Sequence, residues 1–234
     1  MIVGNGLVAN AIRSLDRKGV TFLAAGVSDS KCKDLNEYER EQKLVEKIVE
    51  ESKGDLLVYF STYSVNDPAM RENLYVKRKL EIESYISTHC SSYIIVRISN
   101  LVGQRGNPKN VFNFFYYSIV TGQRFSLWSN ARRNLITEED FVKVVNHILE
   151  VKAKEGYNCI VNAINSRSFS VLEIVQSIEN YTGIQALYEL VEIESVPINQ
   201  ELDADRWFAD LEISTDEYLK KILDKYYKER EIVL

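Results

Sequence analysis

Residues 56–79 read LLVYFSTYSVNDPAMRENLYVKRK, an apolar segment typical of a buried strand that ends in hydroxyl residues and leads into a helical segment. Residues four positions apart lie on one face of a helix, so Tyr75 and Lys79 are expected side by side. A tyrosine normally ionises near pH ~10, and a fixed ammonium nearby stabilises its phenolate form and suits it to acid–base chemistry. Thr62, at the end of the strand, is placed to hold a reacting oxygen. The segment therefore predicts a proton relay of Thr62, Tyr75 and Lys79 for hydride chemistry on a carbonyl or an alcohol.

The spacing of this pair is weak evidence by itself. The chain holds 14 tyrosines among 234 residues, and with its lysines about one such pair is expected by chance. The alternative interpretation is a half-buried aromatic ring beside a solvated lysine. The surrounding sequence has to support the relay.

The first residues, MIVGNGLVA, combine a short apolar strand with a GxGxxA turn and a helical segment that extends to about Arg17. Glycines in such a turn allow a pyrophosphate to approach the backbone, and Ala9 allows the helix to pack closely on the strand. The helix N-terminus adds N–H donors for phosphate. The segment predicts a dinucleotide site at Gly4, Asn5, Gly6, Leu7 and Val8; the alternative is a purely structural turn.

Along the rest of the chain, strand-like and helix-like segments alternate. Strands are expected at residues 20–25, 56–60, 93–98 and 158–163, and helices at 35–52, 75–88, 111–121 and 138–152. Capping-box patterns at 137–140 and 170–173 mark helix starts. The alternation predicts an α/β fold with a doubly wound, Rossmann-like parallel sheet. No flexible linker is visible, so residues 1–234 are expected to form a single domain.

Composition narrows the class of protein. A net charge of −5 without a basic block argues against a nucleic-acid partner. No apolar run approaches the ~18 residues of a membrane span, and no secretory leader is expected. Cys32, Cys90 and Cys159 are scattered and resemble reduced thiols of a cytoplasmic protein, and His89 and His147 form no ligand pair, so no metal site is expected.

Together these motifs resemble the extended short-chain dehydrogenases/reductases, the NAD(P)-dependent epimerase/dehydratase family that acts on nucleotide sugars. The resemblance covers nearly the whole chain and is carried by residues 4–9, 22–26, 61–62 with Tyr75 and Lys79, 96–103 (VRISNLVG), 122–127, 133–140 and 162–183. It implies a site for NADP or NAD formed by Gly4, Asn5, Gly6, Leu7, Val8, Ala24, Ala25, Gly26, Ser61, Tyr75, Lys79 and Ile98. It also implies a nucleotide-sugar substrate bound by Asn100, Asn110 and Arg133, in a small C-terminal substrate lobe built from about residues 104–140 and 164–234. A homodimer formed through the Tyr75 helix and the 111–121 helix is implied as well.

The chain departs from the family at one place. If residues 20–25 correspond to the family's fourth strand, the second and third strands and their helices are missing between Lys18 and Val20. The residue that reads the cofactor's ribose would then be missing too. A rival alignment makes residues 20–25 the second strand and Asp29 the ribose reader. We favour the first alignment, because Ala24-Ala25-Gly26 resembles the adenine-side loop and the next strand already carries Ser61-Thr62.

Absent residues narrow the chemistry further. Sugar dehydratases of the family carry an Asp-Glu pair directly after the catalytic threonine, where this chain has Tyr63-Ser64. Reduction of a 4-keto sugar is the first expectation, and 4-epimerisation is the alternative. A third possibility, from another class, is an inactive module that binds a sugar nucleotide or a partner.

Each of the proposed substrate residues also has an alternative interpretation in which it does not bind substrate. Arg133 is a surface charge in one interpretation, and Arg105 contacts phosphate in its place in another. Asn100 and Asn110 are also suited to turns and helix caps. Trp128 closes a base pocket or lies in the core.

Overall fold

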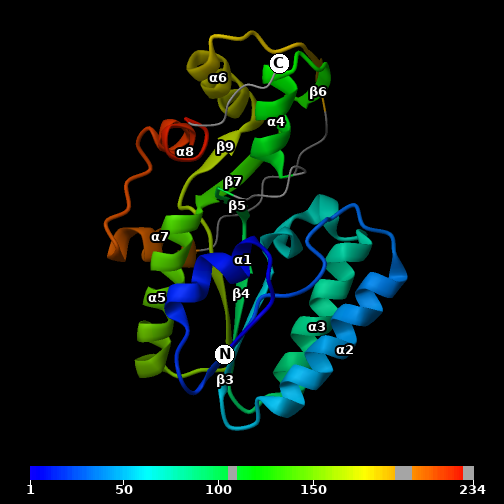
Figure 1. Ribbon diagram of the computed structural model, residues 1–234, viewed down its shortest axis with the longest axis vertical. Coiled ribbons are helices and arrows are strands. Elements are labelled where there is room, and N and C mark those ends of the chain that lie inside the picture. The colour runs from blue at the N-terminus through cyan, green and yellow to red at the C-terminus, as the bar shows by residue number, and fades with distance from the viewer. Residues whose placement is uncertain (105–109, 193–201, 229–234) are drawn as a thin grey trace.

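The computed structural model describes residues 1–104, 110–192 and 202–228. Its centre is a five-stranded sheet in the order β1-β2-β3-β4-β8, and every neighbouring pair is parallel (Figure 1). These strands are β1 (Ile2–Val3), β2 (Val20–Leu23), β3 (Leu56–Thr62), β4 (Tyr93–Ile98) and β8 (Cys159–Ala163). All seven residues of β3 are buried, as expected for a strand covered on both faces.

Helices cover both faces of this sheet. On one face, Leu57 and Tyr59 of β3 pack with residues of α2 (Leu35–Glu51) and α3 (Leu74–His89). On the other face, Val58 and Phe60 share a core with α1 (Leu7–Ala11) and α5 (Glu138–Glu155), and Figure 1 shows the two helix layers on opposite sides. The expected Rossmann-like α/β fold is confirmed.

The strand order decides between the two alignments. β2 lies between β1 and β3, with Phe22 paired to Ile2 on one side and to Val58 on the other. The rival alignment requires β2 on the outer side of β1, so it is wrong, and Asp29 is not at the position of a ribose reader. Among the described residues no strand pairs with the outer side of β1. The described part of the chain therefore holds no strand that extends the sheet beyond β1.

Element boundaries differ from the sequence expectation in one informative place. The glycine-turn helix is α-helical only over Leu7–Ala11 and continues as a 3₁₀ turn over Ile12–Leu15, short of the expected end at Arg17. The chain must reach β2 only a few residues later, and Gly19, with φ +79°, lies in the turn before it. The tight connection leaves no room for a longer helix.

A second group of elements lies beyond the carboxyl ends of the central strands. It contains the strands β5 (Asn100–Val102), β7 (Arg132–Thr137) and β9 (Ser168–Ser170) in one sheet, and β6 (Phe125–Trp128) with β10 (Tyr188–Val191) in another. Its helices are α4 (Val111–Val120), α6 (Val171–Thr182) and α8 (Tyr218–Tyr226), whereas α7 (Leu202–Asp210) packs beside α5. One continuous hydrophobic core joins this group to the face of the sheet that α5 covers. None of the described helices is both long and apolar enough to cross a membrane.

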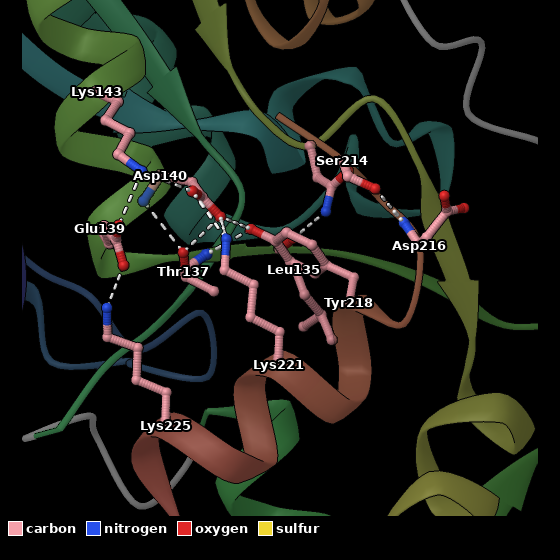
Figure 2. A network of polar contacts seen from close by, with 11 residues as sticks. Leu135, Thr137, Glu139, Asp140, Lys143, Ser214, Asp216, Tyr218, Lys221 and Lys225 are labelled. Carbon is pink, nitrogen blue, oxygen red and sulfur yellow. Dashed lines mark hydrogen bonds and ion pairs between the residues drawn. The ribbon is translucent and has the colours of Figure 1, made fainter. Parts of the chain in front are cut away.

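Asp140 joins α8 to the start of α5 (Figure 2). Its carboxylate is fully buried and accepts hydrogen bonds from Thr137 Oγ1, Tyr218 OH and Lys221 Nζ, each at 2.8 Å. Tyr218 OH also accepts a bond from the backbone N–H of Thr137 at 3.0 Å. Burial raises the pKa of Tyr218, so its phenol stays protonated and can donate to the carboxylate. The end of β7, the start of α5 and the helix α8 are thus all held by the buried carboxylate of Asp140.

Removing a partner of this carboxylate should destabilise the fold. Tyr218→Phe leaves buried polar groups of Asp140 and Thr137 with fewer partners, and we expect a loss of about 1–3 kcal/mol in the free energy of unfolding. Asp140→Ala removes the acceptor shared by Thr137 Oγ1, Tyr218 OH and Lys221 Nζ and should cost more than Tyr218→Phe. Urea unfolding measures both, with the exposed Tyr157→Phe as the control that should stay within ~0.5 kcal/mol of wild type.

The contact between α5 and α8 should weaken in acid. Hydrogen bonds from Lys143 and Lys225 lower the pKa of Glu139 to about 2. A carboxylate with a depressed pKa stabilises the folded state above its unfolded pKa of about 4.3, and this contribution is lost as the pH falls toward the folded value. Amide hydrogen exchange of residues 218–226 should therefore accelerate in this window more than that of residues 82–86. Equal acceleration in both segments would contradict local release of α8.

Candidate functional site

The candidate site lies along one edge of the central sheet. Because all five strands are parallel, their carboxyl ends meet at the same edge. The structure places the glycine turn after β1, residues 24–26 after β2, Ser61 and Thr62 at the end of β3, and Ile98 at the end of β4. Most residues expected to bind a dinucleotide are therefore gathered at one edge, where ligands of open α/β sheets bind.

The glycine turn is built for close backbone contact. Gly4 has φ +132°, and a Cβ there would overlap the carbonyl oxygen of Ala24. The side chain of Asn10 fixes the turn, since its Nδ2 donates to the carbonyl oxygens of Asn5 and Gly6, both at 2.9 Å. A Cβ at Gly6 would meet nothing within 4 Å, so the space above it is open. These features fit the pyrophosphate half of a dinucleotide, whereas no strand among the described residues lies beyond β1 to carry a ribose-reading residue.

The structure brings Tyr75 and Lys79 together on α3. The Lys79 ammonium lies 5.6 Å from the centre of the Tyr75 ring, and Asn73 caps the helix by accepting a bond from the Tyr75 N–H. Thr62 is buried at the end of β3, and its Oγ1 caps the following turn by accepting a bond from the Ser64 N–H at 3.2 Å. The hydroxyl proton of Thr62 is not used by that cap, so the side chain can still donate to a ligand.

Lys79 is not a solvated lysine. Only 4% of it is exposed, and its Nζ lies 2.6 Å from Glu41 Oε1 and 3.3 Å from the Tyr59 hydroxyl. Burial alone lowers the pKa of Lys79, but the phenol groups of Tyr59 and Tyr75 and the carboxylate of Glu41 outweigh it and raise that pKa. Burial has the opposite effect on a phenol, and it raises the pKa of Tyr59. Lys79 is therefore a permanent cation between two aromatic rings and a carboxylate.

The loop after β2 packs over Tyr75. Val27 and Tyr38 form a buried cluster with Tyr75, and the Asn73 side chain donates to the carbonyl oxygen of Ser30 at 3.2 Å. The Tyr38 hydroxyl donates to the Cys32 carbonyl at 3.0 Å. Residues 27–32, which directly follow the expected adenine-side loop at 24–26, thus lie beside the tyrosine of the relay.

Ser61 contacts a second buried ion pair, which joins Glu83 of α3 to Arg97 of β4. Its hydroxyl donates to Glu83 Oε1 at 2.5 Å, and Arg97 of β4 binds the same carboxylate through Nε at 3.1 Å and Nη2 at 2.7 Å. Arg97 also donates to Asn66 at 3.2 Å. Ser61 therefore orders the site through Glu83, and its role in binding a cofactor stays a prediction.

The expected substrate residues have local partners. Asn110 caps α4 and donates to the Leu101 carbonyl at 2.7 Å, and Asn100 donates to the Asn134 carbonyl at 3.0 Å, so their bland interpretation as cap and turn residues accounts for these contacts.

Arg133 is only partly exposed; burial lowers its pKa, and the carboxylate of Asp67 opposes that effect. Arg133 therefore lies near the turns that follow Thr62. Trp128 is 47% exposed, so it is not a core residue. Arg105, the alternative phosphate ligand, lies outside the described residues.

Sequence reasoning missed Glu41 and Glu83, although a signal was present. The buried face of α2 is formed by Tyr38, Glu41, Val45, Ile48 and Val49, so a carboxylate interrupts an apolar stripe. The buried face of α3 contains Glu83 and Lys79 among apolar residues in the same way. A charge on an otherwise apolar helix face indicates a buried ion pair.

Comparison with known sequences supports the family assignment. Residues 53–162, which include β3, α3 and β4, match the family described as "NAD dependent epimerase/dehydratase family". No curated protein matches the chain significantly.

Several solved structures share the fold. The UDP-glucuronic acid 4-epimerase from Bacillus cereus, in complex with UDP-glucuronic acid and NAD, superposes with a TM-score of 0.70 at 19% identity, covering 89% of this chain and 74% of that one. The UDP-glucose 4-epimerase from Thermus thermophilus in complex with NAD gives 0.66 at 16% identity, covering 96% and 84%. The dTDP-glucose 4,6-dehydratase from Bacillus anthracis str. Ames gives 0.68 at 16% identity, covering 98% and 80%.

The sheet order, the motifs along the sheet edge and the matched residues agree with one another: residues 53–162 match the NAD dependent epimerase/dehydratase family, and the chain shares the fold of solved nucleotide-sugar epimerases and dehydratases.

Proposed function

We propose that the protein is an NAD(P)-dependent reductase of a nucleotide-activated 4-keto sugar. The observation that carries this proposal is the Lys79 ammonium 5.6 Å from the centre of the Tyr75 ring, on a helix beside the strand that ends in Thr62. A fixed cation beside a phenol suits acid–base work at a carbonyl or alcohol oxygen.

In the proposed reaction each side chain has one task. The bound nicotinamide supplies the hydride. Thr62 donates a hydrogen bond to the sugar's carbonyl oxygen and orients it, and Tyr75 gives that oxygen its proton. Lys79 stabilises the phenolate that Tyr75 becomes.

We propose NADP or NAD as the cofactor, held at its pyrophosphate by Gly4, Asn5, Gly6, Leu7 and Val8 and along the sheet edge by Ala24, Ala25, Gly26 and Ile98. The open space above Gly6 and the NAD named in complexes with the fold neighbours support this assignment. Because no described strand lies beyond β1, the cofactor would be held weakly and could exchange with free cofactor in solution. A reductase requires such an exchange on every turnover.

The substrate would lie between the sheet edge and a lobe built from about residues 104–140 and 164–234, of which 105–109, 193–201 and 229–234 lie outside the described residues. Arg133 would contact it from a position near Asp67. Asn100 and Asn110 stay proposed substrate residues that would have to share their amides with the backbone contacts described above. A cytoplasmic homodimer is also a proposal. Its interface would be formed by α3, the helix that carries Tyr75, and by α4.

A 4-epimerase is the second candidate. The Bacillus cereus and Thermus thermophilus neighbours are 4-epimerases by name. The same relay could take the proton of one sugar hydroxyl and return it, while a bound nicotinamide would take the hydride from that carbon and return it to the other face. The net oxidation or reduction of the cofactor distinguishes the two activities, because an epimerase returns its cofactor to the starting redox state in each cycle.

The decisive experiment incubates the protein with UDP-glucose or UDP-glucuronic acid and either NAD or NADP in the oxidised form. A reductase working in reverse accumulates reduced cofactor in proportion to oxidised sugar, whereas an epimerase yields the C4 epimer, detected by NMR, without net reduction. No change of either kind, together with a raised melting temperature in the presence of a sugar nucleotide, would favour the inactive binding module.

The tyrosine is the first residue to test. Tyr75→Phe should lower turnover by a factor on the order of 10² or more while the melting temperature stays close to wild type, because only the proton donor is removed. Tyr85→Phe, a tyrosine on the same helix, is the control. Activity of Tyr75→Phe within a few-fold of wild type would contradict the relay.

Cofactor affinity tests the truncated edge. Without a ribose-reading residue, NAD and NADP should bind with micromolar affinity at best and differ little, and any preference for NADP should come from Lys31 and Lys33 and weaken with salt. Both lysines lie in the loop after β2. Calorimetry with both cofactors measures this, and tight binding of NAD with strong rejection of NADP would show that an acidic ribose reader exists.

A further inference from the structure

We propose that Glu41 is a positioning residue of the relay: its carboxylate holds Lys79 as a buried ammonium beside Tyr75. This inference rests on the proposed function and adds a residue of α2 to a relay otherwise built from β3 and α3.

Distance and burial support the assignment. Glu41 Oε1 lies 2.6 Å from Lys79 Nζ, and the side chains are 1% and 6% exposed. The same oxygen accepts a bond from the Tyr59 hydroxyl at 3.3 Å, and Oε2 accepts one from the Val27 N–H at 3.0 Å. Three donors therefore converge on one carboxylate, which fixes it and the ammonium together.

The pair also has a geometric consequence for the cofactor loop. A Cβ at Gly26 would overlap Glu41 Oε1, so glycine is required where the loop after β2 crosses the carboxylate. Val27 packs in the same cluster as Tyr75. Glu41 thus connects the proposed cofactor loop to the relay lysine through direct contacts.

A buried ammonium needs this counter-charge. The groups that face Lys79 are Glu41 from α2, Tyr59 from β3 and Tyr75 from its own helix, with Tyr38 of α2 behind Tyr75. Among them Glu41 is the only carboxylate. Without it, desolvation favours the neutral amine, and the relay loses its cation at alkaline pH.

Stability of the free protein tests the charge on Lys79 without any substrate. Glu41→Gln keeps the shape and an acceptor oxygen. The folded-state pKa of Lys79 should then fall below its unfolded value of about 10.4, so the folded state binds fewer protons and gains stability as the pH rises. The melting-temperature deficit of Glu41→Gln against wild type should therefore shrink by half or more between about pH 7 and about pH 10.

Glu83→Gln is the matched control. Glu83 is also a buried carboxylate at α3, but its partner is Arg97, whose guanidinium does not lose its proton in this range. Its deficit should not change with pH. A deficit of Glu41→Gln that is equally independent of pH would overturn the proposal.

Two further measurements separate positioning from simple support. Lys79→Met should be less stable than the double variant Glu41→Gln/Lys79→Met, because the single change leaves a carboxylate buried without its counter-charge. In the reductive direction, the alkaline limb of the pH–rate profile of Glu41→Gln should move to lower pH by about one unit, and that of Glu83→Gln should stay in place. An alkaline limb that does not move in Glu41→Gln would overturn the positioning role. A wild-type protein that turns over no nucleotide sugar would overturn the proposed function instead. In that case the stability measurements alone would test whether Glu41 holds Lys79 as an ammonium.

Discussion

Two charges on the buried face of α3 constrain the arrangement of the whole site. Lys79 and Glu83 are both about 4% exposed, and an unpaired charge at such depth would cost several kcal/mol. Each must therefore meet an opposite charge from another element: Lys79 meets Glu41 of α2, and Glu83 meets Arg97 of β4. The two pairs fix the position of α3 against its neighbouring helix and against the sheet. Tyr75, one turn before Lys79, takes its place from that position.

The shortened edge of the sheet gives these pairs a particular importance. In a longer sheet, strands beyond β1 would surround the adenosine half of a cofactor. Here β1 has no strand on its outer side among the described residues, so that half of the site is open. The glycine turn remains intact because Gly4 and Asn10 fix its backbone. A dinucleotide bound at this site would therefore be held mainly at its pyrophosphate and its nicotinamide end, close to the proposed relay.

The sequence predicted the strong local patterns well. The buried strands from Leu56 and Tyr93 and the capping box at Ser170 each follow from a few neighbouring residues, and the structure confirms them. The short strands β5, β6, β7, β9 and β10 were not predicted, because they carry no continuous apolar run and their partners lie far along the chain. The expectation for β2 rested on comparing Ala24-Ala25-Gly26 with a family loop, and only the pairing of Phe22 with Ile2 and Val58 could decide it.

The partners of Lys79 show why site prediction from sequence stopped short. The i, i+4 rule placed Tyr75 and Lys79 together, but it does not say which side of the helix faces the protein. Glu41 lies 38 positions earlier and meets Lys79 only because α2 and α3 pack on the same face of the sheet. The contact changes the character of the site: the lysine is held by the protein itself, so its ammonium is in place before any cofactor binds. A site organised in this way does not need a permanently bound cofactor to position its catalytic groups, which agrees with a cofactor that exchanges on every turnover.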